Sequence, residues 1–78
     1  MKIKIYLEDS GFVWEIAAAN GTVLASSDIV FTHRKTAVRG LCRFLNLMAP
    51  KNPPRLVTVS GQELQLRKDS NGFYMRYQ

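Results

Sequence analysis

Two stretches of similar sequence decide the fold of this chain: residues 5–16 (IYLEDSGFVWEI) and residues 64–77 (LQLRKDSNGFYMRY). In each, alternating apolar and polar residues lead into an Asp-Ser turn, and a Gly-Phe pair opens a second alternating run. Alternation with a period of two is typical of a β-strand that buries one face. The two stretches therefore predict two β-hairpins of related design. A duplicated hairpin is one interpretation, and chance similarity between two amphipathic hairpins is the other.

Outward from the first hairpin, the sequence predicts a three-stranded meander. Residues 2–7 and 12–19 form the first two strands, and Trp14 lies on the apolar face of the second. Asn20-Gly21 then favours a tight turn, because both residues tolerate positive φ. Residues 22–26 form the third strand of the meander.

Between the two hairpins the period of the sequence changes to 3.6, which predicts a helix over residues 33–48. Thr32 is the expected N-cap, and the helix should end near Ala49 because Pro50 disfavours helical backbone in the residue before it. The following apolar residues lie on one arc of this helix and should face the sheet: Ala37, Val38, Leu41, Phe44, Leu45 and Met48.

Residues 50–55 are a proline-rich linker, and three further strands are expected at residues 56–59, 63–67 and 73–77. The predicted fold class is α+β, an antiparallel sheet of four to six strands with one helix packed on one face. We expect a single domain over residues 1–78, divided into a β-β-β-α unit (1–49), the linker (50–55) and the C-terminal strands (56–78).

The composition indicates an ordinary globular domain with a small core. Hydrophobic residues make up 46% and charged residues 22% of the 78 residues. A chain of this length has a marginal core, which oligomerisation often supplements. No apolar run approaches the roughly 20 residues that a membrane span needs. Because the N-terminus alternates instead of forming an apolar run, no signal peptide and a cytoplasmic location are expected.

The net charge of +5 belongs to the middle of the chain, since no acidic residue stands between Asp28 and Glu63. This segment contains the candidate residues for binding nucleic acid, an acidic partner or another anion: Arg34, Lys35, Arg39, Arg43, Lys51 and Arg55. Lys35, Arg39 and Arg43 are spaced i, i+4, i+8 and should form a row on the exposed side of the helix. The alternative is that this row is only the solvated face of an amphipathic helix.

A second candidate surface is the sheet face away from the helix. Lys2, Lys4 and Tyr6 are expected there together with Tyr74 and Arg76. Aromatic and basic side chains interleaved on an open sheet can bind single-stranded nucleic acid. The alternative is that the tyrosines pack against neighbouring side chains or a partner subunit.

The sequence contains few residues that could form a catalytic or metal site. Cys42 and His33 are the only residues of their types, which is too few for a structural zinc site. A Cys–His nucleophile pair would require the fold to bring them together. Glu8 and Asp9 are adjacent in a turn and do not form a convergent carboxylate pair. We therefore predict no enzymatic activity, no cofactor and no small-molecule substrate.

Residues 14–27 (WEIAAANGTVLASS) resemble the strand–Asn-Gly–strand signature of the YegP-like family of small bacterial proteins. That family then has an aromatic residue and Ser/Thr-x-Lys before a helix with an Ala and a Gly-Ile pair. The corresponding residues here are Phe31, Thr32, His33, Arg34, Ala37, Gly40 and Leu41. The departures are Arg34 for Lys, Leu41 for Ile and Phe44 for a smaller aliphatic residue.

The resemblance covers residues 5–49 and implies β-β-β-α units that occur in tandem or as dimers, with no established reaction. The C-terminal hairpin then looks like the opening strands of a second unit without its helix. We therefore expect a small non-enzymatic accessory or interaction domain that forms a homodimer through its sheet. The alternative function is binding of nucleic acid or another polyanion through the basic helix face.

Overall fold

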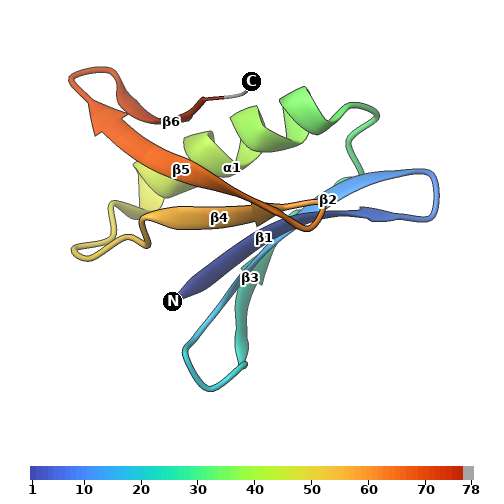
Figure 1. Cartoon of the computed structure of the whole chain (residues 1–78), viewed down its shortest axis with the longest axis horizontal. Helices are drawn as coiled ribbons and strands as arrows, with labels where there is room; N and C mark the ends of the chain where they lie inside the picture. The colour runs from blue at the N-terminus through green and yellow to red at the C-terminus, as the bar shows by residue number, and fades with distance from the viewer. Residues whose placement is uncertain (77–78) are drawn as a thin grey trace.

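A computed structural model describes residues 1–76 and contains six strands and one helix (Figure 1). The elements in chain order are β1 (Lys2–Glu8), β2 (Gly11–Ala17), β3 (Val23–Ser26), α1 (Arg34–Met48), β4 (Leu56–Val59), β5 (Gln62–Asp69) and β6 (Gly72–Met75). The predicted α+β class is confirmed, and so is the helix to within one residue. The strand expected at residues 73–77 is found as β6, while Tyr77 lies outside the described residues.

The prediction of a purely antiparallel sheet was wrong, because the sheet is mixed. Its strand order is β3-β2-β1-β4-β5-β6, and β1 pairs with β4 in parallel through Lys4↔Thr58 and Ile5↔Val59. The reason lies in the connection: β1 and β3 both run antiparallel to β2, and α1 carries the chain back across the sheet before β4 begins. A crossover through a helix delivers a parallel strand, whereas a tight turn delivers an antiparallel one.

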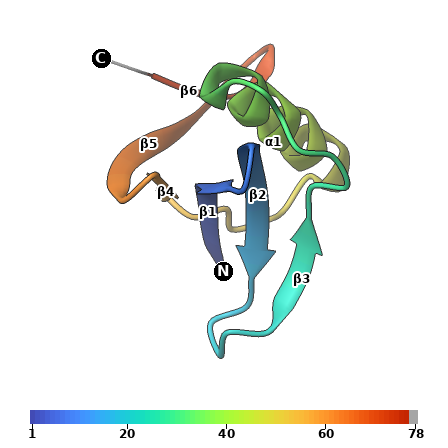
Figure 2. The ribbon, with the colours of Figure 1, turned by 90° about the vertical axis from the view of Figure 1, so that its right-hand side faces the viewer.

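The sheet curls around α1, so that the helix lies on its concave side. Figure 2 shows the curl running from β3 through β1 and β4 to β5, with β6 beside the helix. The largest fully buried side chains come from the facing surfaces of strands and helix: Ile5, Ile16, Leu41, Leu45, Val57 and Val59. Trp14 is buried as predicted, with its ring centroid 4.9 Å from that of Phe44. Met48 differs from the prediction, since it is exposed at the last turn.

The helix begins one residue later than expected, and Thr32 is not its N-cap. His33 is the N-cap residue, with extended φ and ψ of −121° and 144° and no capping bond from its side chain. Phe31 explains the shift, because its N–H donates to the carbonyl of Phe12 at 2.8 Å and its carbonyl accepts from the N–H of Phe12 at 2.7 Å. These two bonds keep the chain extended through Phe31, so the helical turn starts only beyond it.

The helix ends at Ala49, as the sequence predicts. Ala49 adopts the left-handed conformation with φ 48° and ψ 58°, and its N–H donates to the carbonyl of Leu45 at 2.8 Å. This bond is typical of a helix C-terminus, where the last carbonyls otherwise lack partners. Pro50 then prevents the helix from continuing.

The two similar hairpins of the sequence are β1–β2 and β5–β6. Both have a two-residue turn, because Glu8 pairs with Gly11 and Asp69 pairs with Gly72. Their positions in the sheet differ, since β1 lies at the centre and β6 at an edge. The likeness therefore concerns the local design of a hairpin and not an equivalent place in the fold.

One side-chain hydrogen bond fastens the edge strand β6 to the helix. Asn46 accepts a hydrogen bond from the Phe73 N–H through its Oδ1 at 2.8 Å. Gly72 makes the approach possible: its φ is +114°, and a Cβ at this position would lie 2.5 Å from Asn46 Oδ1. The N–H of Phe73, which has no strand to bond on this side, is thereby satisfied.

Replacing Asn46 by alanine is expected to lower the free energy of unfolding by about 1 kcal/mol, because the part-buried Phe73 N–H loses its acceptor. Urea denaturation at 25 °C measures this change. Asn46→Asp keeps an oxygen acceptor and should lose less, and Asn52→Ala, in the exposed loop after the helix, serves as the control. Equal stability of the Asn46→Ala and Asn52→Ala proteins would contradict the assigned role.

Candidate functional site

The structure brings only part of the predicted basic cluster together. All six candidate residues are exposed: Arg34, Lys35, Arg39, Arg43, Lys51 and Arg55. Lys35, Arg39 and Arg43 lie on successive turns of α1 and form a row about 12 Å long. We call these three residues the basic row. Arg34 lies about 100° around the helix from Lys35, whereas Lys51 and Arg55 follow the C-terminal end of the helix, in the loop before β4.

The positive charge of the basic row is not compensated within residues 1–76. The ion pair found there joins Lys4 Nζ to Glu15 Oε1 at 3.5 Å, on the opposite face of the sheet. Lys35, Arg39 and Arg43 therefore have no carboxylate partner in the described part of the chain. Uncompensated positive charge on one surface attracts anionic ligands.

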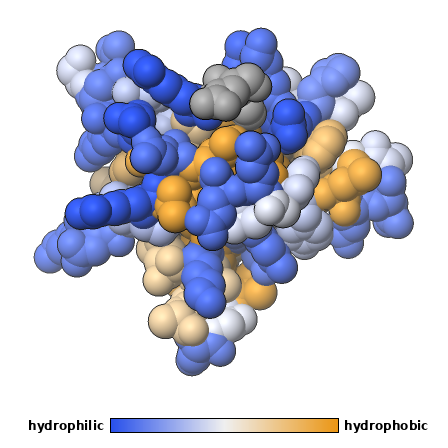
Figure 3. All heavy atoms as spheres, viewed as in Figure 1, coloured by the Kyte–Doolittle hydropathy of each residue, from blue (hydrophilic) through white to orange (hydrophobic). Residues whose placement is uncertain are grey.

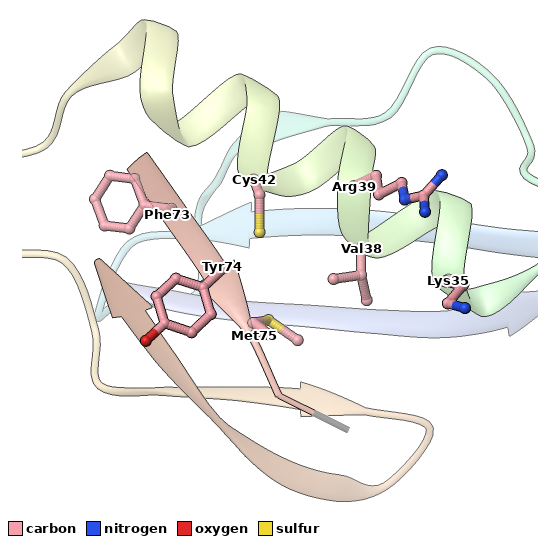
Figure 4. Close-up of a pocket in the computed structure, with 7 residues that line it drawn as sticks. All are labelled: Lys35, Val38, Arg39, Cys42, Phe73, Tyr74 and Met75. Atoms are coloured by element: carbon pink, nitrogen blue, oxygen red, sulfur yellow. The ribbon is translucent and has the colours of Figure 1, made fainter. Parts of the chain in front are cut away.

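A groove between α1 and β6 lies beside the basic row (Figure 4). It has a volume of about 210 Å³ and is lined by Lys35, Val38, Arg39 and Cys42 of the helix and by Phe73, Tyr74 and Met75 of the strand. The groove thus combines an apolar lining with two cations at its rim. Sequence reasoning missed it, since only the curled sheet brings β6 alongside this side of the helix.

Cys42 and His33 do not form a pair. Cys42 is buried and lines the groove, while His33 is exposed at the N-cap of the helix. Nine positions of helix separate them, which corresponds to about 13 Å along the axis. Burial raises the pKa of the Cys42 thiol, so its thiolate is scarcer near neutral pH than that of an exposed cysteine.

The outer face of the sheet does not assemble the expected aromatic platform. Tyr6 lies on β1 and Tyr74 on β6, with β4 and β5 between them, about 14 Å apart across the sheet. Lys4 already has partners, since its Nζ lies 5.0 Å from the Tyr6 ring centroid and pairs with Glu15. Partial burial, followed by the Glu15 carboxylate, raises the pKa of the Tyr6 hydroxyl.

Exposed apolar side chains lie on β3 and in the loop that follows it, at the other edge of the sheet. Val23, Leu24, Ile29 and Val30 are 53%, 59%, 61% and 55% exposed, and we call these four residues the apolar edge. Figure 3 shows that the surrounding surface is largely hydrophilic, with apolar atoms in small groups, one of them over the β2–β3 turn. Exposed apolar side chains at an unpaired sheet edge are candidates for an interaction surface.

Comparisons with known proteins give no family. No protein-family model matches the sequence, and no curated protein or solved structure matches it either. The YegP-like resemblance of residues 5–49 therefore stays a prediction. Within the described residues no helix has the length and apolar character of a membrane span.

The buried position of Cys42 predicts low reactivity toward iodoacetamide. At pH 8 the folded protein should react at least about tenfold more slowly than the urea-unfolded chain, because thiolate fraction and access both fall on burial. Because the pKa of the Cys42 thiol is raised in the folded state, alkylation of the folded protein should still become faster with rising pH where the rate for the unfolded chain no longer changes. Mass spectrometry of timed samples measures both rates, and equal rates would contradict the burial.

Proposed function

We propose that this protein is a small non-enzymatic interaction domain that forms a homodimer through the apolar edge. The observation that carries the proposal is the exposure of Val23, Leu24, Ile29 and Val30 on and after an edge strand. The proposal agrees with the small core expected for 78 residues, which a second copy would enlarge.

The edge of β3 lacks two of the features that protect edge strands, charged residues and prolines, while it is four residues long and its register with β2 shifts between Ile16 and Ala17. Protected edges carry lysine, proline or an inward-pointing charge, or are short or bulged. Residues 22–27 contain no charged residue and no proline, and β3 has a neighbouring strand on one side only within the described residues. The backbone groups on its outer side are therefore open to pairing with another strand.

The proposed dimer is symmetric. Two copies of β3 paired antiparallel around a two-fold axis would place the same surface of each copy in the interface. Such pairing extends the sheet through both copies and covers Val23 and Leu24. The outer face of the sheet is a weaker candidate, because Lys4, Glu15 and Glu63 are distributed over β1, β2 and β5.

Sedimentation velocity from about 1 to 100 µM tests this proposal. The unmodified protein is expected to be a dimer over part of this range, and Leu24→Lys should weaken the dimer at least about tenfold, because pairing would bury the added charge. Leu47→Lys is the matched control, since Leu47 is 81% exposed on the helix and outside the apolar edge.

Two results would overturn the self-association. One is a monomer at every concentration, and the other is an equal effect of Leu24→Lys and Leu47→Lys. Circular dichroism of each variant shows whether the fold is retained, so that a loss of association is not confused with unfolding.

A second candidate function, binding of nucleic acid or another polyanion, is supported by the absence of carboxylate partners around the basic row within residues 1–76. Lys35, Arg39 and Arg43 are exposed at one-turn spacing, which suits contacts to successive phosphates. Binding of this kind is largely independent of sequence and depends strongly on salt.

Fluorescence anisotropy with labelled single- and double-stranded DNA and RNA at 20–200 mM salt tests the second function. If the basic row contacts phosphates, replacing its three residues by alanine should reduce the salt slope on duplex DNA by about 2.7, since each contact contributes about 0.9. An unchanged slope, or no binding by either protein, would refute it.

A further inference from the structure

We propose that the groove between α1 and β6 binds an extended segment of a partner protein, which adds as a strand to the free edge of β6 and carries apolar and acidic side chains. This site lies at the opposite edge of the sheet from the apolar edge. It does not depend on the proposed self-association. Four features of the groove support the proposal: the backbone of β6, the shape of the groove, its lining and its charge.

The backbone of β6 offers hydrogen-bonding groups toward the groove. Phe73 donates its N–H to Asn46 and not to β5, so the N–H and carbonyl of Phe73 point away from β5. Because these groups alternate along an antiparallel strand, those of Met75 point the same way. The Phe73 carbonyl and both backbone groups of Met75 thus lie at an edge that no other strand of the described chain pairs with.

The groove lies beside a hydrogen bond between helix and strand and is open to solvent. The Asn46–Phe73 hydrogen bond joins helix and strand near the start of β6. Beyond this bond the two elements border the cavity, with Val38 and Lys35 on the helix and Met75 on the strand (Figure 4). An edge strand with a helix running alongside is an arrangement in which proteins bind peptides by strand addition.

The lining of the groove suits an apolar side chain. Val38, Cys42, Phe73 and Met75 are each at most 8% exposed, yet they border a cavity of about 210 Å³. A strand paired to the β6 edge places alternate side chains on the same face, and one of these would point into this cavity. Methionine and aromatic linings adapt well to varied apolar side chains.

The charge around the groove selects an acidic segment. Lys35 and Arg39 line it without a carboxylate partner in residues 1–76, and Lys68 adds a third positive charge, with its Nζ 5.1 Å from the Phe73 ring centroid. Acidic side chains two positions before and after the apolar residue, on the same face of the added strand, would pair with these cations. A nucleic acid would use the cations but neither the apolar lining nor the free edge of β6, so the peptide accounts for more of the site.

The test uses a fluorescein-labelled decapeptide in which valine and glutamate alternate along one face of the strand and threonine occupies the other face, titrated with the full protein in fluorescence anisotropy. We expect saturable binding that is at least about tenfold tighter than binding of the lysine–valine counterpart. The same acidic peptide with alternate backbone nitrogens methylated should bind at least about tenfold more weakly, because strand addition needs its N–H groups.

Two double variants with the same change in net charge distinguish binding in the groove from attraction to the net positive charge of the protein. Lys35→Glu with Arg39→Glu should weaken binding of the acidic peptide at least about tenfold. Arg43→Glu with Lys51→Glu changes the net charge equally outside the groove and should have little effect. Leu24→Lys, which addresses the apolar edge, should leave peptide binding unchanged. A failure of the peptide site is therefore distinguishable from a failure of dimerisation.

Protection of Cys42 provides a second readout that does not rely on the label, since Cys42 lines the groove and is the only cysteine. Saturating peptide should slow its alkylation by iodoacetamide several-fold. Four results would overturn the proposal: no binding of the acidic peptide, equal loss with both double variants, full binding of the methylated peptide, or displacement of the peptide by an oligonucleotide at an equal charge concentration.

Discussion

The parallel pair between β1 and β4 is the contact on which the rest of the structure depends. It joins the meander β1–β3 to the strands β4–β6, and its central residues Ile5 and Val59 are both 1% exposed. The Ser60 N–H extends the pairing by donating to the Ile5 carbonyl at 2.8 Å. Because β4 attaches to β1 and not to β3, the sheet has β3 at one edge and β6 at the other.

The two edges differ in chemistry, and the proposed functions follow from that difference. Residues 22–27 at the β3 edge carry no charge, so two copies of this segment bring no like charges together. The β6 edge lies against α1, with Lys35 and Arg39 at its side, and two copies would bring like charges together. Self-association therefore suits β3, whereas β6 suits an acidic segment from another protein.

Much of the fold is predictable from the sequence, because its signals are local. Alternation, the Asn-Gly turn and the apolar arc from Ala37 to Leu45 predict the strands and the helix closely. The parallel pair was not predicted, because the sequence of the proline-rich linker does not indicate which edge of the meander β4 joins. The N-cap was misplaced because Phe31 is held by Phe12, a contact between residues far apart in the sequence. The basic row was predictable from helical spacing, but the groove beside it depends on the curl of the sheet.

The central claim is that this domain meets its partners through the edges of its sheet, first through β3. Isotope-filtered NMR on a mixed sample of ¹³C-labelled and unlabelled protein tests it most directly, because it reports only contacts between copies. Pairing through β3 predicts intermolecular NOEs that join Val23, Leu24 and Ala25 of one copy to the same strand of its partner. Intermolecular NOEs confined to the outer sheet face or to the helix would contradict it.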